Sequence, residues 1–190
     1  MTEHKTPSLD SLFADLLASV EAGSDRLPPV ARWNPPLSGD IDIRIARNGD
    51  WFHEVAPIHR EGLKRLFSSI LKREGGDYYL VTPAEKWRIE VDDVPFFVTG
   101  VERVVRDGQE ALLFETATGE RVVAGQAHPL RVVIDPESGE PAPYLLVRDG
   151  MEGLLARGVF YQLADWACGG PEKKQAVQGV YSLGVFFPLE

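Results

Sequence analysis

Three cationic side chains near the middle of the chain, Arg60, Lys86 and Arg88, are suited to binding an anion. The guanidinium group of Arg60 is a planar fork that can hold a phosphate with two hydrogen bonds. Lys86 directly follows a Thr-Pro-Ala-Glu sequence, in which Thr82 has the position of a helix N-cap and Glu85 that of its capping-box partner. The first turn of a helix exposes backbone N–H groups that attract anions. One interpretation is therefore a phosphate-binding turn at Thr82, to which Lys86 and Arg88 add positive charge.

A structural interpretation of the same turn is preferred. Trp87, Ile89 and Val91 alternate with polar residues, which is the two-residue period of a half-buried strand, so the helix can have only one turn. If Thr82 and Glu85 satisfy each other's backbone N–H groups, few donors remain for an anion. The turn is therefore expected to be first a rigid connector between two strands and second a phosphate site that uses Lys86.

Arg157 is the other candidate for an anion contact. It lies in a predicted helix with little free polar face, so we expect it to be buried and to need a carboxylate or a ligand anion. A salt bridge is the preferred partner. Trp51, Phe96 and Tyr144 are candidate walls of a ligand pocket, because such pockets are mostly apolar and aromatic.

Catalytic chemistry and metal binding are not indicated. Adjacent residues in an extended segment point to opposite sides, so Asp92-Asp93 is expected to cap a turn and not to share a proton or a metal. The spacing of His53, His59 and His128 does not suit zinc or iron. Glycine-rich nucleotide-binding motifs, a Gly-x-Ser-x-Gly elbow and Cys-x-x-Cys are absent. The sequence therefore predicts no catalytic residues, no metal and no cofactor.

Composition restricts the class of protein. The 190 residues carry a net charge of -9, which argues against a nucleic-acid polymer as ligand, because such binding depends on cationic contacts to phosphates. Residues 41–90 hold nine Lys/Arg and eight Asp/Glu and are the segment that would least repel a small anion. The single cysteine, Cys168, fits a reducing compartment. No apolar stretch approaches the roughly 20 residues that span a bilayer. We expect a cytoplasmic protein without a membrane partner.

The first half of the chain is expected to contain two helices and several strands. Apolar residues of the segment 9–20 recur with helical spacing. The Pro-rich segment 26–39 is expected to be an extended connector. Residues 41–55 alternate around Asn48-Gly49, and a three-residue loop with left-handed Gly49 places Ile45 opposite Trp51 and Ile41 opposite Val55. Residues 58–74 have an amphipathic helical pattern that ends at Gly75-Gly76.

The second half is expected to be richer in strands. Short strands separated by turns at Asp107-Gly108, Thr118-Gly119 and 137–139 are typical of a curved antiparallel sheet or small barrel. A capping box at Asp149 is expected to open a helix over residues 150–167, and a strand over 180–187 to close the chain. The pattern predicts an α+β protein with three parts: residues 1–34 as an N-terminal helix and strap, 35–94 as a first half, and 95–190 as a second, barrel-like half.

The two halves also show a repeated pattern. Residues 41–73 and 130–167 are both expected to run strand, turn, strand, helix. Glu61-Gly62-Leu63 and Glu152-Gly153-Leu154 lie at matching places, 91 residues apart. We interpret this as an internal duplication, which would create an interface between two related halves.

The segment "GDWFHEVAPIHREGLKRLFSSILKREGGDYYLVTPAEKWRIEVDDVPFF" closely resembles the bacterial domain-of-unknown-function family 1285. The resemblance rests on a Gly-x-Trp, a Leu-Val-Thr-Pro-x-Glu-Lys and a stop resembling Asp-Pro-Phe, and it extends more weakly over residues 35–190. It implies a duplicated α+β core whose second half resembles a pleckstrin-homology-type barrel. It also implies a nucleotide-like ligand between the halves and a place in signalling, but no established reaction.

Three functions remain open, in order of preference. The first is a ligand-binding or regulatory module that holds a small phosphorylated or nucleotide-like molecule between its halves. The second is a protein-interaction adaptor that offers a groove or sheet edge of the barrel-like half to a peptide. The third is an enzyme of unrecognised type acting on a phosphorylated metabolite.

Overall fold

The computed structural model describes residues 13–14, 27–170 and 177–190. The predicted helix over residues 9–20 lies outside the described residues, except for Phe13 and Ala14. Phe13 is buried and meets the ring of Phe67 edge-on, with 5.1 Å between the ring centroids.

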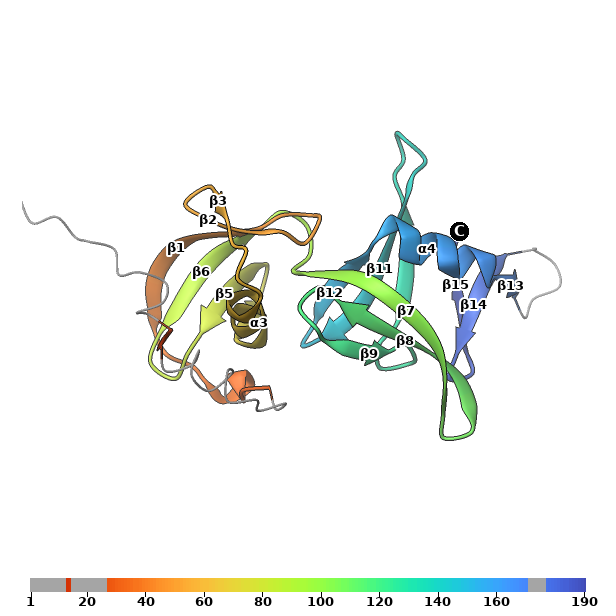
Figure 1. The fold of residues 1–190 in the computed structure, drawn as a ribbon, viewed down its shortest axis with the longest axis horizontal. Helices are drawn as coiled ribbons and strands as arrows, with labels where there is room; N and C mark the ends of the chain where they lie inside the picture. Colours follow the sequence, from red (N-terminus) through yellow and green to blue (C-terminus); the bar gives the residue numbers. More distant parts are fainter. Residues whose placement is uncertain (1–12, 15–26, 171–176) are drawn as a thin grey trace, which may run out of the picture.

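The first half is a six-stranded mixed sheet with one α-helix against it (Figure 1). Its strands lie in the order β3-β2-β1-β6-β5-β4, and β1 runs parallel to β6 at the centre. The elements are η1 (Val30–Arg32), β1 (Leu37–Ile45), β2 (Trp51–His53), β3 (Ala56–Pro57), α3 (Glu61–Ser69), β4 (Leu71–Glu74), β5 (Asp77–Val81) and β6 (Lys86–Val91). The Pro-rich connector therefore holds one short 3-10 turn, η1, and its end begins β1.

The second half contains another six-stranded mixed sheet, a helix and a small three-stranded sheet. The large sheet has the order β10-β11-β12-β7-β8-β9, and β12 runs parallel to β7. The elements are β7 (Phe96–Arg106), β8 (Gln109–Thr116), β9 (Arg121–Val123), β10 (Leu130–Ile134), β11 (Pro141–Arg148), β12 (Met151–Leu155), α4 (Arg157–Asp165), β13 (Cys168–Gly169), β14 (Gln178–Ser182) and β15 (Val185–Pro188).

The predicted fold class, α+β with a repeated strand-turn-strand-helix unit, is wrong. The described residues are mostly β, with fifteen strands and only two α-helices. Glu61 opens helix α3, but Glu152, its predicted counterpart, lies within strand β12. The large sheet of the second half has two edge strands, β10 and β9, and is not a pleckstrin-homology-like barrel. What the halves share is a sheet topology, in which two three-stranded antiparallel units are joined by parallel pairing of the first and last strands.

The β1–β2 hairpin has the predicted register next to its loop, but the predicted pair Ile41–Val55 is wrong, because Val55 lies in the turn to β3 with a φ of +63° and is 93% exposed. Ile45 pairs with Trp51 and Ile43 with His53 across a three-residue loop, and Gly49 has a φ of +86°. Both isoleucines face the core: Ile43 is 1% exposed and Ile45 is 0% exposed. The loop reaches the start of β7 in the second half (Figure 1), where a Cβ on Gly49 would lie 2.5 Å from Cβ of Phe97.

The helix predicted over residues 58–74 is shorter in the structure. Helix α3 ends at Ser69, and Leu71–Glu74 form an edge strand that pairs with β5 across Gly75. The apolar stripe of α3 was predicted correctly, because Leu63, Leu66 and Phe67 are buried. Hydrogen bonds to β5 outweigh the continued helical pattern of the last four residues.

Arg148, at the end of β11, joins the two halves. Its guanidinium group donates to the backbone oxygens of Ser68 and, at 3.5 Å, Leu71. The last carbonyl groups of a helix lack partners within the helix and form the negative end of its dipole. Arg148 therefore caps the C-terminal end of α3 from the other half, and its guanidinium group also lies 5.3 Å from the ring centroid of Phe96.

Ser68 makes a second link between the halves through its side chain. Its hydroxyl donates to the carboxylate of Glu120, in the turn between β8 and β9. The same carboxylate accepts hydrogen bonds from the hydroxyl groups of Thr116 and Thr118. The buried apolar residues of both halves also form one continuous cluster. None of the helices among the described residues is long and apolar enough to cross a membrane.

Candidate functional site

The turn between β5 and β6 is a connector whose backbone donors are used internally. The hydroxyl of Thr82 accepts from the N–H groups of Ala84 and Glu85, at 3.3 and 2.9 Å, and the N–H group of Thr82 donates to the backbone oxygen of Glu85 at 2.8 Å. The carboxylate of Glu85 instead accepts from the indole of Trp87 at 3.4 Å. The hydrogen bonds to Thr82 that the capping box predicts are therefore present, and the N–H groups of Ala84 and Glu85 point at Thr82.

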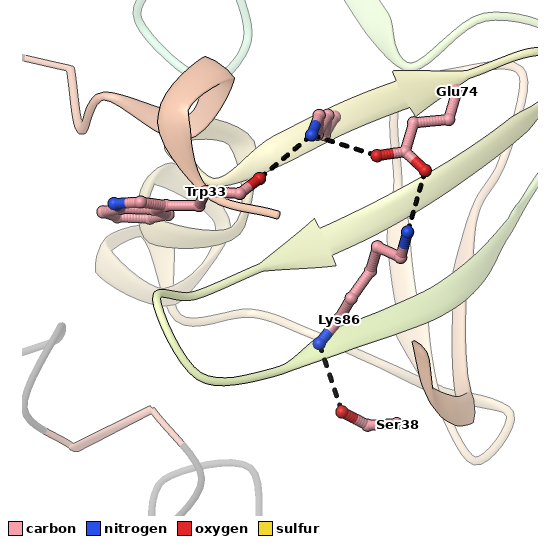
Figure 2. A network of polar contacts seen from close by, with 5 residues as sticks. Trp33, Ser38, Glu74 and Lys86 are labelled. Atoms are coloured by element: carbon pink, nitrogen blue, oxygen red, sulfur yellow. Dashed lines mark hydrogen bonds and ion pairs between the residues drawn. The ribbon is translucent and has the colours of Figure 1, made fainter. Parts of the chain in front are cut away.

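Lys86 belongs to a network of polar contacts that holds the Pro-rich connector against the first sheet (Figure 2). Its ammonium group lies 2.8 Å from one oxygen of Glu74, and the ammonium group of Lys72 lies 3.0 Å from the other. Lys72 also donates to the backbone oxygen of Trp33, and the N–H group of Lys86 donates to the hydroxyl of Ser38. The two ammonium groups, that of Lys86 first, lower the pKa of the Glu74 carboxyl.

Arg88 lines a hollow of about 890 Å³ in the first sheet, beside a register shift in the β1–β6 pairing between Asp40 and Arg44. The guanidinium group of Arg88 is held by both carboxylate oxygens of Asp40, at 2.7 and 3.0 Å. The other charged lining residues are all acidic: Asp42, Asp77, Glu90 and Asp92. An anion would be repelled from this hollow.

A second pocket, of about 440 Å³, lies between the two halves and has the opposite character. The first half contributes Arg47 and Asn48 from the β1–β2 loop. The second half contributes strands β7, β11 and β12 and the start of α4. Its apolar walls are Phe97, Pro141, Pro143, Leu154, Leu155, Ala156, Phe160 and Tyr161, and its remaining polar residues are Glu140 and Arg157. We call this the inter-half pocket.

Arg47 is fixed at the pocket by the segment that joins the halves. Its Nε lies 3.0 Å from the carboxylate of Asp93, which also accepts a hydrogen bond from the hydroxyl of Tyr144 at 2.9 Å. Burial, and then the neighbouring carboxylate, raise the pKa of Tyr144. The preceding carboxylate, Asp92, pairs with Arg44 at 2.7 Å. Asp92 and Asp93 lie in a bend after β6, and they thus tie the junction to Arg44 and Arg47 of the first half.

Arg157 lies on the other side of the pocket, as the first residue of α4. The prediction that it is buried is wrong, because its side chain is 74% exposed. It lies 3.9 Å from the carboxylate of Glu140, which is 71% exposed. The preceding residue, Ala156, has no polar side chain, so no side chain caps the N-terminal end of α4.

The remaining predicted site residues lie elsewhere. Arg60 precedes α3 as its N-cap, where its backbone oxygen accepts from Leu63. Trp51 is 2% exposed and stacks on Phe67 in the core, and Phe96 is 2% exposed beneath Arg148. The structure therefore gathers Arg60, Thr82, Lys86, Arg88 and Arg157 at no common point.

Two features of the inter-half pocket were not predicted from the sequence. Arg47 is one of three residues in a loop whose geometry was predicted, but nothing in the sequence indicates that the loop reaches the other half. Phe96, and not Phe97, was predicted to be a wall of the pocket. Because Phe96 and Val98 lie on the same face of β7 and both are buried, at 2% and 0% exposure, alternation leaves Phe97 for the opposite face.

Nothing in the described geometry points to a metal centre. Among residues 13–14, 27–170 and 177–190, no three His, Cys, Asp or Glu side chains come together in a group that could hold a metal ion. The chemistry that the inter-half pocket offers is non-covalent: two guanidinium groups for an anion, and aromatic and proline surfaces for a planar body.

The fold and the pocket define a mostly β protein of two similar six-stranded sheets, with a small cationic and aromatic pocket between its halves. Two family models match it: "Domain of unknown function (DUF1285), N-terminal domain" over residues 28–94 and "Protein of unknown function (DUF1285), C-terminal domain" over residues 95–189. The chain belongs to the DUF1285 family, and the resemblance seen in its sequence is confirmed.

Two crystal structures of DUF1285 family proteins are similar to it. The protein from Silicibacter pomeroyi DSS-3 is 49% identical, with a TM-score of 0.78 over 92% of this chain and 93% of its own. The protein from Shewanella baltica OS155 is 25% identical, with a TM-score of 0.52 over 66% of this chain and 91% of its own. No curated protein matches the chain.

Proposed function

We propose that this protein is a cytoplasmic ligand-binding or regulatory module that holds a small phosphorylated or nucleotide-like molecule in the inter-half pocket. The ligand's anionic group contacts Arg47 and Arg157, and its planar part lies against Phe97, Phe160 and Tyr161. A ligand in contact with both halves biases their arrangement, and this is how such a module takes part in signalling.

One observation carries the proposal. The inter-half pocket combines residues of both halves, and its lining holds two arginines and one carboxylate in a protein of net charge -9, with Asp93, the partner of Arg47, outside that lining. Its volume of about 440 Å³ is within the range of pockets that enclose small molecules. The larger hollow beside Arg88 has carboxylates where an anion would need donors.

A thermal-shift screen against nucleotides and phosphorylated metabolites tests the proposal. A ligand present at 100 times its dissociation constant stabilises the folded state by about 2.7 kcal/mol. For a chain of this length that corresponds to a rise in Tm of about 5 to 11 °C. A panel without a shift, on protein that unfolds cooperatively, would contradict the proposal.

Variants then locate the ligand. Arg157→Ala and Arg47→Ala should each weaken binding by about tenfold or more, because each removes a charge-assisted donor to the anion. Arg88→Ala is the matched control, since it deletes the same side chain at the acidic hollow and should leave the affinity unchanged. Equal losses in all three variants would indicate a general charge effect and would place the ligand elsewhere.

One observation favours the adaptor as a second candidate. Strand β10 is an edge of the second large sheet, and its Val133 and Ile134 are 43% and 47% exposed. An edge strand with exposed apolar side chains can accept a peptide as an additional strand. Protection of the β10 amides from hydrogen exchange by a bound peptide would support this function.

A further inference from the structure

The charges around the inter-half pocket are already nearly balanced. Arg47 is paired with Asp93 and Arg157 with Glu140. The two pairs differ in strength, because Asp93 is 25% exposed and is also held by Tyr144, whereas Arg157 and Glu140 are both more than two-thirds exposed and 3.9 Å apart. A ligand anion therefore replaces Glu140, and not Asp93, as the partner of an arginine.

The displaced carboxylate cannot move far from the pocket. The backbone of Glu140 is tied into a turn, in which its oxygen accepts from the N–H group of Asp135 at 2.9 Å and its N–H group donates to the hydroxyl of Ser138 at 3.3 Å. The carboxylate of Asp135 in turn accepts from the N–H groups of Glu137 and Ser138. Glu140 thus stays at the rim, beside Pro141 and across from Arg157.

A carboxylate at this place limits the charge of the ligand. One phosphate or carboxylate group can take up Arg157 and the nearby donors of α4, but each further phosphate adds negative charge close to Glu140 and Asp93. The same carboxylate can accept hydrogen bonds from hydroxyl or amino groups, which a sugar supplies. The aromatic walls favour a planar body.

We propose that Glu140 is a specificity-determining residue, which restricts the inter-half pocket to planar ligands with a single anionic group, such as a nucleoside monophosphate, and rejects their polyphosphates. This inference rests on the proposed function, since it concerns the same pocket.

Calorimetric titration of the full chain with adenosine mono-, di- and triphosphate tests the proposal. The titrations are made with EDTA and without Mg²⁺, which would neutralise the polyphosphates, and at constant low salt, because exposed charges are screened. The wild type should bind the monophosphate most tightly. Glu140→Gln should bind all three nucleotides more tightly than the wild type does, because Arg157 no longer has to be released from Glu140. The gain should be larger for the triphosphate, about five- to tenfold, than for the monophosphate, because the triphosphate also escapes the repulsion of its further charges.

The control is Glu137→Gln, which removes the same charge from the same turn. It should leave the order of the three affinities as in the wild type. Tightest binding of the triphosphate by the wild type, or equal changes in the two variants, would overturn the role of Glu140 while leaving the pocket as a ligand site. If none of the three nucleotides binds the wild type at millimolar concentration, the nucleotide pocket itself is contradicted, and the role of Glu140 with it.

Discussion

Glu74 illustrates how single residues hold the Pro-rich connector to the first sheet. Its carboxylate lies between the ammonium groups of Lys72 and Lys86, and these bring Trp33 and Ser38 into the same network. The carboxylate is one-third exposed, so the pairs stabilise the fold only modestly, as partly exposed ion pairs do. The charge of Lys86 thus serves the fold, whereas the similar charge of Arg157 has only a distant, exposed partner.

The stability that Glu74 provides should depend on pH. Its pKa is lowered in the folded state from the ordinary value of 4.5, so the folded state binds fewer protons than the unfolded state at mildly acidic pH. The contribution is complete above the unfolded pKa and is lost as the pH falls through the folded pKa. Glu74→Gln should lower the Tm at pH 7 by about 2 to 4 °C, which corresponds to about 1 kcal/mol.

Thermal melts of both proteins between pH 7 and pH 3 check this. The difference in Tm should shrink towards zero below the folded pKa of Glu74. Glu137→Gln serves as the control for loss of charge, because Glu137 is exposed and has no cationic partner among the described contacts. A difference in Tm that stays constant down to pH 3 would show that the charge of Glu74 does not stabilise the contact with the Pro-rich connector.

At the level of elements, local patterns predicted strands and turns well and helix lengths poorly. The register of the β1–β2 hairpin follows from alternation and from the conformation that Asn48-Gly49 favours, which are properties of a few neighbouring residues. Met151–Leu155 had a helical pattern but forms a strand, because it pairs in parallel with β7, more than fifty residues away. Gly153 was the available indication: a Cβ there would lie 3.1 Å from Phe96 and Val98, and glycine in a strand often marks such a close approach.

The candidate site was predictable only in part, for the same reason. Arg157 was identified, although its exposure was not, because its chemistry can be recognised without a partner. Arg47 and Phe97 acquire their role from the contact of a hairpin loop with another half of the chain. That contact depends on pairing between distant strands, which no local period encodes.

The β1–β2 loop should tolerate no side chain at Gly49. Alanine there would adopt a left-handed conformation, at about 1 to 2 kcal/mol, and its Cβ would lie 2.5 Å from that of Phe97. Relief of that overlap adds about 1 to 3 kcal/mol. Gly49→Ala should therefore lower the free energy of unfolding by roughly 2 to 5 kcal/mol in urea titrations.

Gly108→Ala separates the two causes. Gly108 lies in the β7–β8 turn with a φ of +77°, and a Cβ there would meet nothing within 4 Å. Only the conformational part should remain, about 1 to 2 kcal/mol. Equal destabilisation by the two substitutions would mean that the loop does not press on Phe97.

At the scale of the whole molecule, the two halves are joined by one continuous apolar cluster, by a hydrogen bond from Arg73 to the backbone oxygen of Gly150, and by three further contacts. The β1–β2 loop packs on Phe97, the junction is held through Asp93, and Arg148 with Glu120 binds the end of α3. The inter-half pocket is bordered by the first two of these three contacts. Any ligand that moves Arg47 therefore acts on the same groups that fix the arrangement of the halves.

Arg148 should couple the unfolding of the two halves, because its side chain is 14% exposed and donates to the backbone oxygens of Ser68, at the end of α3, and of Leu71, in β4. Arg148→Met keeps most of the apolar stem but leaves those carbonyl groups without their cationic partner, so it should destabilise the protein by about 2 to 3 kcal/mol. In calorimetry the wild type should unfold in one transition, and the variant in two, with the first roughly 4 to 12 °C below that of the wild type.

Arg106→Met, at the exposed end of β7, removes the same charge and should leave one transition near the wild-type Tm. A single, unshifted transition in Arg148→Met would mean that the other contacts between the halves couple their unfolding without Arg148.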